Sequence, residues 1–211
     1  MRAALDRLCR IVYVAARAGA VNCTDAFDLA AWALESRPTD RDATELALLS
    51  LDCAPASRPR MAELALILLE AGGFDPGFAE EPEWLECVEE AMRLVNRDLA
   101  ASGLGGRCRL RVHDDEPGCS GNAYAESWDG RTGTAQGIFP ASGADPVSAL
   151  VAVADDAQDA VMHTLWSPWP VCPVHQLGVH ARDHDKAGVW WCAGGSGHVA
   201  AAIGGWPGPA Q

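Results

Sequence analysis

Apolar residues recur at three- and four-residue spacing through most of the first 75 positions, which is the pattern of amphipathic helices. Polar or glycine-containing links interrupt this pattern and mark the ends of the segments. The pattern predicts four helices, over residues 3–19, 24–33, 40–49 and 57–71. Because the links between them are short, we expect residues 1–78 to form a helical bundle with antiparallel neighbours.

After the turn-rich segment 74–78, the hydrophobic period changes along the chain. Strict alternation around residues 107–113 is typical of a half-exposed strand, since successive side chains of a strand point to opposite faces. The remaining pattern predicts a helix over residues 82–101, strands over 123–127 and 134–139, and a long helix over 145–165. Residues 79–211 are therefore expected to form an α+β domain built on a helix–three-strand–helix unit.

Charge narrows the classes of partner. The chain has 211 residues and a net charge of −13, so it repels polyanions unless a local basic patch compensates. Its longest basic clusters are short, at residues 58–60 and 107–111, and we expect no nucleic-acid partner. Residues 1–20 carry dispersed charges, so they predict neither a signal peptide nor a membrane span. An acidic surface suits a protein partner, for example a basic one, and the pattern predicts no particular oligomeric state.

Eight cysteines are present, without the appearance of a small secreted disulfide scaffold. Cys9, Cys53 and Cys87 lie among apolar neighbours in predicted helices and are interpreted as small core residues. Cys119 lies in a glycine-rich loop a few residues after His113. An exposed loop cysteine is the simplest interpretation, ahead of a disulfide with Cys108 or a Cys–His nucleophile. A reducing cytoplasm is the expected compartment.

Metal-binding side chains are concentrated near the carboxy-terminal end. Cys172, His175, Cys192 and His198 follow the pattern C-x2-H-x16-C-x5-H, which is close to the ligand spacing of structural zinc sites. A tight Cys-Pro-Val-His turn can present a thiolate and an imidazole together, and a hairpin can return the chain to supply the second pair. The sequence thus predicts a Zn2+ site, with His180 as the alternative fourth ligand because C-x5-H is a wide spacing.

The order of this turn, a hairpin and the start of a helix resembles the zinc-ribbon or treble-clef class of metal modules. The resemblance covers about 35 residues, and it implies a small zinc-stabilised module at about 169–206. We expect the hairpin strands at residues 177–182 and 188–192, and a short helical segment after His198. The expected fold is α+β: an N-terminal helical bundle, the helix–three-strand–helix unit, and this C-terminal zinc module.

Two functions compete at the predicted metal site. Four protein ligands would close the site and make it structural, which favours a non-enzymatic adaptor, inhibitor or immunity-type protein acting through an acidic, tryptophan-bearing surface. Three ligands would leave a position for an activated water, as in a zinc-dependent hydrolase. Such an enzyme needs a general base, for which Asp183, Asp185 and Glu126 are candidates, but no hydrolase signature supports them.

One further group of polar residues calls for interpretation. Asp156, Asp159 and His163 fall on one face of the predicted helix over residues 145–165 and could bind a cation or a basic partner. A solvated helix face explains the same spacing without any ligand, and we adopt that interpretation.

The tryptophans clustered near the metal module are expected mainly in the core, with one or two exposed as an anchor for a partner.

Overall fold

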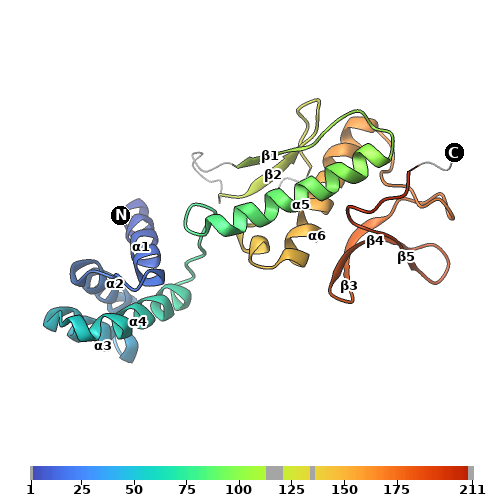
Figure 1. Ribbon diagram of the computed structural model, residues 1–211. Helices are drawn as coiled ribbons and strands as arrows, with labels where there is room; N and C mark the ends of the chain where they lie inside the picture. Colours follow the sequence, from blue (N-terminus) through green and yellow to red (C-terminus); the bar gives the residue numbers. More distant parts are fainter. Residues whose placement is uncertain (1, 113–120, 134–135, 209–211) are drawn as a thin grey trace. The chain divides into compact units, whose positions relative to one another are not determined.

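The protein divides into two compact units, Met1–Pro76 and Gly77–Gln211 (Figure 1). The structure is a computed structural model, and it describes residues 2–112, 121–133 and 136–208. These residues combine six α-helices with two antiparallel sheets of two and three strands, all strands lying in the second unit. The mixed helix and sheet content expected from the sequence is confirmed. In the described part of the chain, no helix is both long enough and apolar enough to cross a bilayer.

The first unit is a bundle of helices. Its elements are α1 (Arg2–Arg17), α2 (Cys23–Ser36), α3 (Arg41–Asp52), the short 3-10 helix η1 (Pro55–Ser57) and α4 (Arg58–Ala71). Asn22 and Asp40 begin α2 and α3, since their side-chain oxygens accept hydrogen bonds from the backbone N–H groups of Asp25 and Ala43. Leu29, Leu46 and other fully buried aliphatic residues fill the centre of the bundle.

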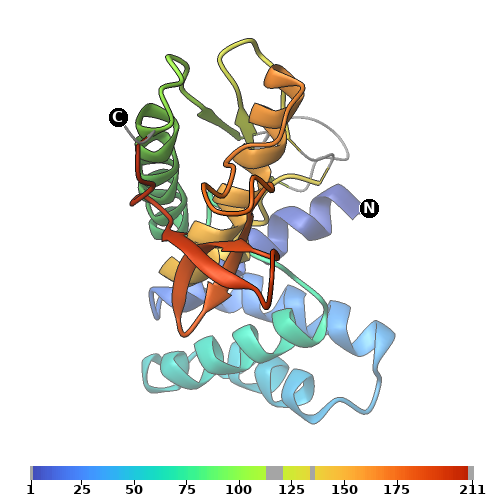
Figure 2. The same cartoon turned by 90° about the vertical axis from the view of Figure 1, so that its right-hand side faces the viewer.

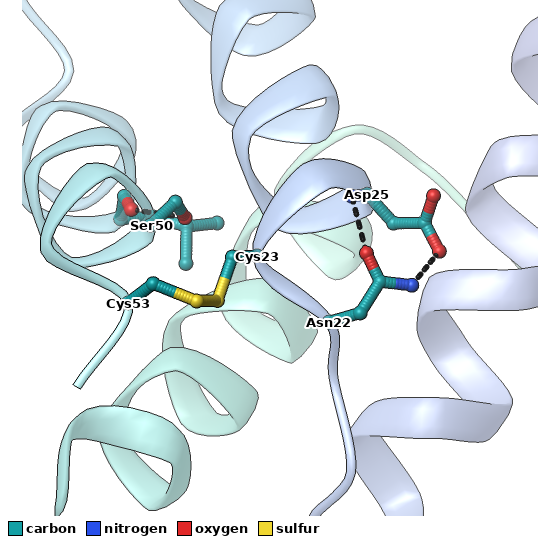
Figure 3. The surroundings of a disulfide bond; sticks show 6 residues. Asn22, Cys23, Asp25, Ser50 and Cys53 are labelled. Carbon is teal, nitrogen blue, oxygen red and sulfur yellow. Dashed lines mark hydrogen bonds between the residues drawn. A yellow bond between two sulfur atoms is a disulfide. The ribbon is translucent and has the colours of Figure 1, made fainter. Parts of the chain in front are cut away.

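A disulfide joins Cys23, at the first residue of α2, to Cys53, which follows the last residue of α3 (Figure 3). The interpretation of Cys53 as a small core residue was therefore wrong, because its side chain is exposed and bonded to another cysteine. Cys9 is buried in the bundle as expected, and Cys87 is a half-buried free thiol of the second unit. The bond ties two helix ends that the hydrophobic pattern alone cannot pair.

The second unit is organised around two long helices, α5 (Pro82–Ala101) and α6 (Pro146–Leu165), which pack side by side (Figure 1). The hairpin β1 (Arg109–Val112) and β2 (Ala123–Glu126) follows α5, and the 3-10 helix η2 (Pro140–Ala144) precedes α6. The buried faces of both helices and Ile138 form one core. The predicted third strand, 134–139, includes positions outside the described residues, and its described part contributes a single bridge, between Ala123 and Ile138.

The carboxy-terminal part forms the three-stranded sheet β3–β4–β5 (Figure 2). Its strands are β3 (His180–His184), β4 (Ala187–Cys192) and β5 (His198–Ala202). Asp185 and Lys186 form the two-residue turn between β3 and β4, and both have positive φ, as a tight hairpin turn requires. The hairpin was predicted, but the helix expected after His198 was wrong. That segment pairs with β4 as an antiparallel strand, with a register shift opposite Trp190 and Trp191.

Candidate metal centre

Four side chains from two separated turns converge at one end of the three-stranded sheet. The ligand atoms of Cys172, His175, Cys192 and His198 all lie within 4.8 Å of one another. The sulfur of Cys172 lies 3.8 Å from Nδ1 of His175 and 3.6 Å from Nε2 of His198, and the sulfur of Cys192 lies 3.4 Å from the same Nδ1. Tetrahedral zinc with ordinary Zn–S and Zn–N bonds separates sulfur from nitrogen by roughly 3.5 Å. The cluster therefore has the dimensions of such a site.

The first pair of ligands comes from a tight turn before β3. The N–H of Cys172 donates to the carbonyl of Leu177 at 2.8 Å, and the N–H of Gln176 donates to the carbonyl of Cys172 at 2.9 Å. Val171 and Gly178 form a bridge below the turn, so that its two ends are held in register. This closed loop places the thiol of Cys172 and the imidazole of His175 on the same side.

The second pair comes from the connection between β4 and β5, where Cys192 is the last residue of one strand and His198 the first residue of the next. These two residues are register partners, so antiparallel pairing itself brings them together across five intervening positions. The wide spacing is accommodated by a glycine-rich turn, in which the N–H of Gly197 donates to the carbonyl of Gly194. The His175 ring lies over Gly194, and a Cβ added there would be 2.5 Å from Cγ of that ring.

Burial differs between the two kinds of ligand. Cys172 and Cys192 are fully buried and belong to the core that α5 and α6 share, whereas His175 is exposed and His198 is half-buried. The two imidazole rings lie 5.1 Å apart between their centroids. The sulfurs are thus fixed by packing, and the imidazoles cover them from the solvent side.

The thiol of Cys172 is electrostatically prepared to lose its proton. Burial raises its pKa, but hydrogen bonds from the backbone N–H groups of His175 and Val174, together with the side chains of His175 and Cys192, outweigh burial and lower the pKa from 9.0 to about 6. The N–H of Gly194 donates to the sulfur of Cys192 at 3.4 Å. Donors aimed at sulfur favour the thiolate, which is the form that binds a metal.

Not every predicted site residue joins this cluster. His180, the alternative ligand, is an exposed residue of β3 and lies outside the group of four. In the described part of the chain no carboxylate belongs to the group, and Glu126 instead forms an ion pair of 3.6 Å with Arg111 in the other sheet. The Cys119 and His113 pair lies outside the described residues.

The interpretation of Asp156 as part of a solvated face was wrong. Its side chain is 3 % exposed, and it accepts a hydrogen bond of 2.6 Å from the N–H of Ala125 in β2. On the same helix, Gln158 is also buried and donates to the carbonyls of Trp169 and Val179, on either side of the first ligand turn. The polar residues of α6 therefore hold the β1–β2 sheet and the two ends of the first ligand turn to the helix.

Asp98 of α5 has a similar role that the sequence reasoning missed. Its carboxylate accepts hydrogen bonds from the indole of Trp190 and from the N–H groups of Gly204 and Trp206. The sequence feature that marks Asp98 is its place as a charged residue within an apolar helical stripe, between Val95 and Leu99. A carboxylate at such a position is buried only when it has partners, and those partners lie about one hundred residues away.

No protein-family model matches the chain, and no curated protein or solved structure is significantly similar to it. Two thiols and two imidazoles are a donor set typical of structural zinc sites, and four protein ligands fill a tetrahedral shell. What the arrangement can do is bind a metal ion and thereby join the first ligand turn to the β4–β5 connection.

Proposed function

We propose that the protein is a zinc-stabilised, non-enzymatic binding protein whose C-terminal module resembles a zinc ribbon. The observation that carries this proposal is the closed set of four ligand atoms within 4.8 Å of one another, without a carboxylate among them. Structural zinc sites have four protein ligands, whereas catalytic sites keep a position for water and usually a nearby general base. The zinc-dependent hydrolase is the less favoured alternative for that reason.

The proposed binding surface lies around the first ligand turn. Val171, Val174 and Leu177 flank the ligands and are exposed, Val174 to 74 %. Next to them a cleft of about 450 Å³ is lined by Val171, Pro173 and Trp206, among other residues. A bound metal ion would restrain the backbone of the ligand turn. The outward side chains of the turn would then be held rigidly and could contact a partner at low entropic cost.

The partner class follows from charge. With a net charge of −13, the protein attracts cationic surfaces, so we propose a protein partner that inserts apolar side chains beside the turn and surrounds them with lysine or arginine. Trp166, which is 83 % exposed at the end of α6, is a second anchor of the kind that is common at interfaces.

Two measurements test the proposal separately. Metal analysis should find one zinc ion per chain, and the cobalt-substituted protein should give a tetrahedral spectrum that azide does not change. A spectrum that shifts with azide would show an open position and favour the hydrolase.

A peptide-binding experiment tests the surface. Binding of a labelled cationic amphipathic peptide should weaken in the V174S/L177S double variant and should not change in Val14→Ser, whose residue is exposed on α1. Equal binding by all three proteins would contradict the proposed surface.

A further inference from the structure

A second site of a different chemical character lies in the same unit. A groove of about 1230 Å³ runs between the carboxy-terminal half of α5 and the β1–β2 hairpin. Arg93, Asn96 and Arg97 line it from the helix, and Arg107 and Arg109 line it from the strand side. This groove shares no lining residue with the metal cluster.

Positive charge is concentrated at this groove in an otherwise acidic unit. Residues 77–211 contain eight arginine and lysine residues, and four of them, Arg93, Arg97, Arg107 and Arg109, line the groove. Within the described residues neither Arg107 nor Arg109 forms an ion pair. Arg93 pairs with Glu90 on its own helix, so Arg97, Arg107 and Arg109 are left to create a local positive potential, which is the electrostatic signature of an anion site.

The two walls of the groove are held at a set spacing. Arg93 and Arg97 are four positions apart on α5 and so share one face of the helix, while Arg107 and Arg109 are two positions apart and share one side of an extended segment. Asn96 joins the walls, since its side chain donates to the carbonyl of Cys108 at 2.9 Å and accepts from the N–H of Cys108 at 2.8 Å. The groove is therefore preformed.

An aromatic ring completes it. Trp128 lines the groove and remains 41 % exposed, although tryptophan is normally well buried. Its indole rests against Gly106, where an added Cβ would lie 2.0 Å from Cδ2 of the ring. Contact with the backbone on one side holds the ring in place, and its exposed part is free to stack on a planar group.

We propose that this groove binds nucleotides, with phosphates on the arginines and a base on Trp128. Guanidinium groups bind phosphate through paired hydrogen bonds, and an exposed aromatic ring next to a basic groove is how proteins hold single-stranded nucleic acid. An acidic peptide would satisfy the arginines but would leave the indole without a planar partner. One carboxylate, Glu126, also lines the groove, and its pairing with Arg111 reduces its repulsion of phosphate. The sequence alone predicts no nucleic-acid partner, because the two arginine pairs are brought together only by the fold.

Fluorescence anisotropy with a labelled twelve-residue oligothymidylate tests the proposal. At about 50 mM salt the full-length protein should bind it, with log K falling against log salt at a slope of about −2, as three phosphate contacts on a single strand imply. Trp128→Leu should weaken binding about tenfold, the loss of one stacked base. Competition with ATP decides between the two sources of the ligand: competition at equal concentration indicates a mononucleotide site, and its absence indicates a strand.

Matched variants separate charge from folding. The R107Q/R109Q pair should lower the salt slope by about 1.4, whereas the R58Q/R60Q pair in the first unit should leave it unchanged. Zinc content and tryptophan fluorescence of each variant verify the fold. Absence of binding by both oligothymidylate and ATP would overturn the proposal. So would binding that R107Q/R109Q does not alter, or tighter binding of polyglutamate that Trp128→Leu does not affect.

Discussion

The indole N–H of Trp190, in the central strand of the C-terminal sheet, donates a hydrogen bond of 2.7 Å to the buried carboxylate of Asp98 in α5. The same carboxylate accepts from the N–H groups of Gly204 and Trp206, after the last strand. Trp190 also packs edge to face on Trp169, which leads into the first ligand turn. One acidic side chain therefore ties α5 to the central strand and to the end of the segment that carries the metal ligands, and Trp190 extends the contact to Trp169 at its beginning.

Replacing Asp98 should be severely destabilising. Asp98→Ala leaves three donors without an acceptor, and we expect the free energy of unfolding of the second unit to fall by about 3 kcal/mol or more. Denaturant unfolding followed by tryptophan fluorescence measures this, since seven of the eight tryptophans lie in residues 77–211. Glu89→Ala, on the exposed side of the same helix, is the control and should change stability by less than about 0.5 kcal/mol. Similar losses in both variants would contradict the assigned role.

The two histidines proposed for the fourth ligand can be distinguished directly. His198→Ala should lose bound zinc and lower the melting temperature of the second unit, because metal binding and folding of such a module are coupled. His180→Ala should retain one zinc ion per chain, since that side chain lies outside the cluster. Metal analysis after dialysis against a weak chelator gives the comparison. Retention of zinc by His198→Ala and its loss from His180→Ala would reverse the assignment.

Replacing Gly194 by alanine tests the ligand geometry by adding a methyl group beside His175. A methyl group there would lie 2.7 Å from Nδ1 of His175, the atom that faces both sulfurs. We expect Gly194→Ala to displace the imidazole and reduce zinc affinity at least tenfold, measured by chelator competition. The neighbouring Gly195→Ala adds backbone strain of about 1 kcal/mol at a positive φ, but its methyl group stays 3.6 Å from the same ring. Its zinc affinity should therefore stay near that of the parent protein.

The disulfide should stabilise the first unit alone. Cys23 and Cys53 are 30 positions apart, and closing a loop of that size lowers the entropy of the unfolded chain by an amount worth roughly 3–4 kcal/mol. A reductant without metal affinity should therefore increase hydrogen exchange in α2 and α3 and leave α5 and α6 unchanged. In Cys53→Ser the reductant should have no effect on exchange. A uniform change across both units would contradict this assignment.

The disulfide also bears on the expected compartment. Disulfides persist mainly in oxidising environments, whereas the paired thiols of the metal cluster are free. A cytoplasmic location stays a prediction, and the oxidation state of Cys23 and Cys53 in protein taken directly from cells would test it.

Periodicity was a good guide wherever a residue's environment depends on its close neighbours in the chain. The fifth predicted helix, over residues 82–101, coincides with α5, and Asp145 begins α6 as its cap. The helix predicted after His198 was wrong because a short apolar run suits a helix or a strand equally, and pairing with β4 made it a strand. The solvated environment predicted for Asp156 was wrong because helical spacing specifies which residues share a face but not what covers that face.

By itself, the sequence determined the helices, the hairpin and the spacing of four metal-binding side chains, because these depend on residues that are close along the chain. Only the tertiary structure decided that Cys192 and His198 meet the first ligand turn, that Cys23 pairs with Cys53, and that Asp98 lies beneath Trp190. It also gathered two separate arginine pairs into one groove. Such contacts join residues far apart in the chain, and packing of the core selects them from many alternatives that local pattern leaves equally possible.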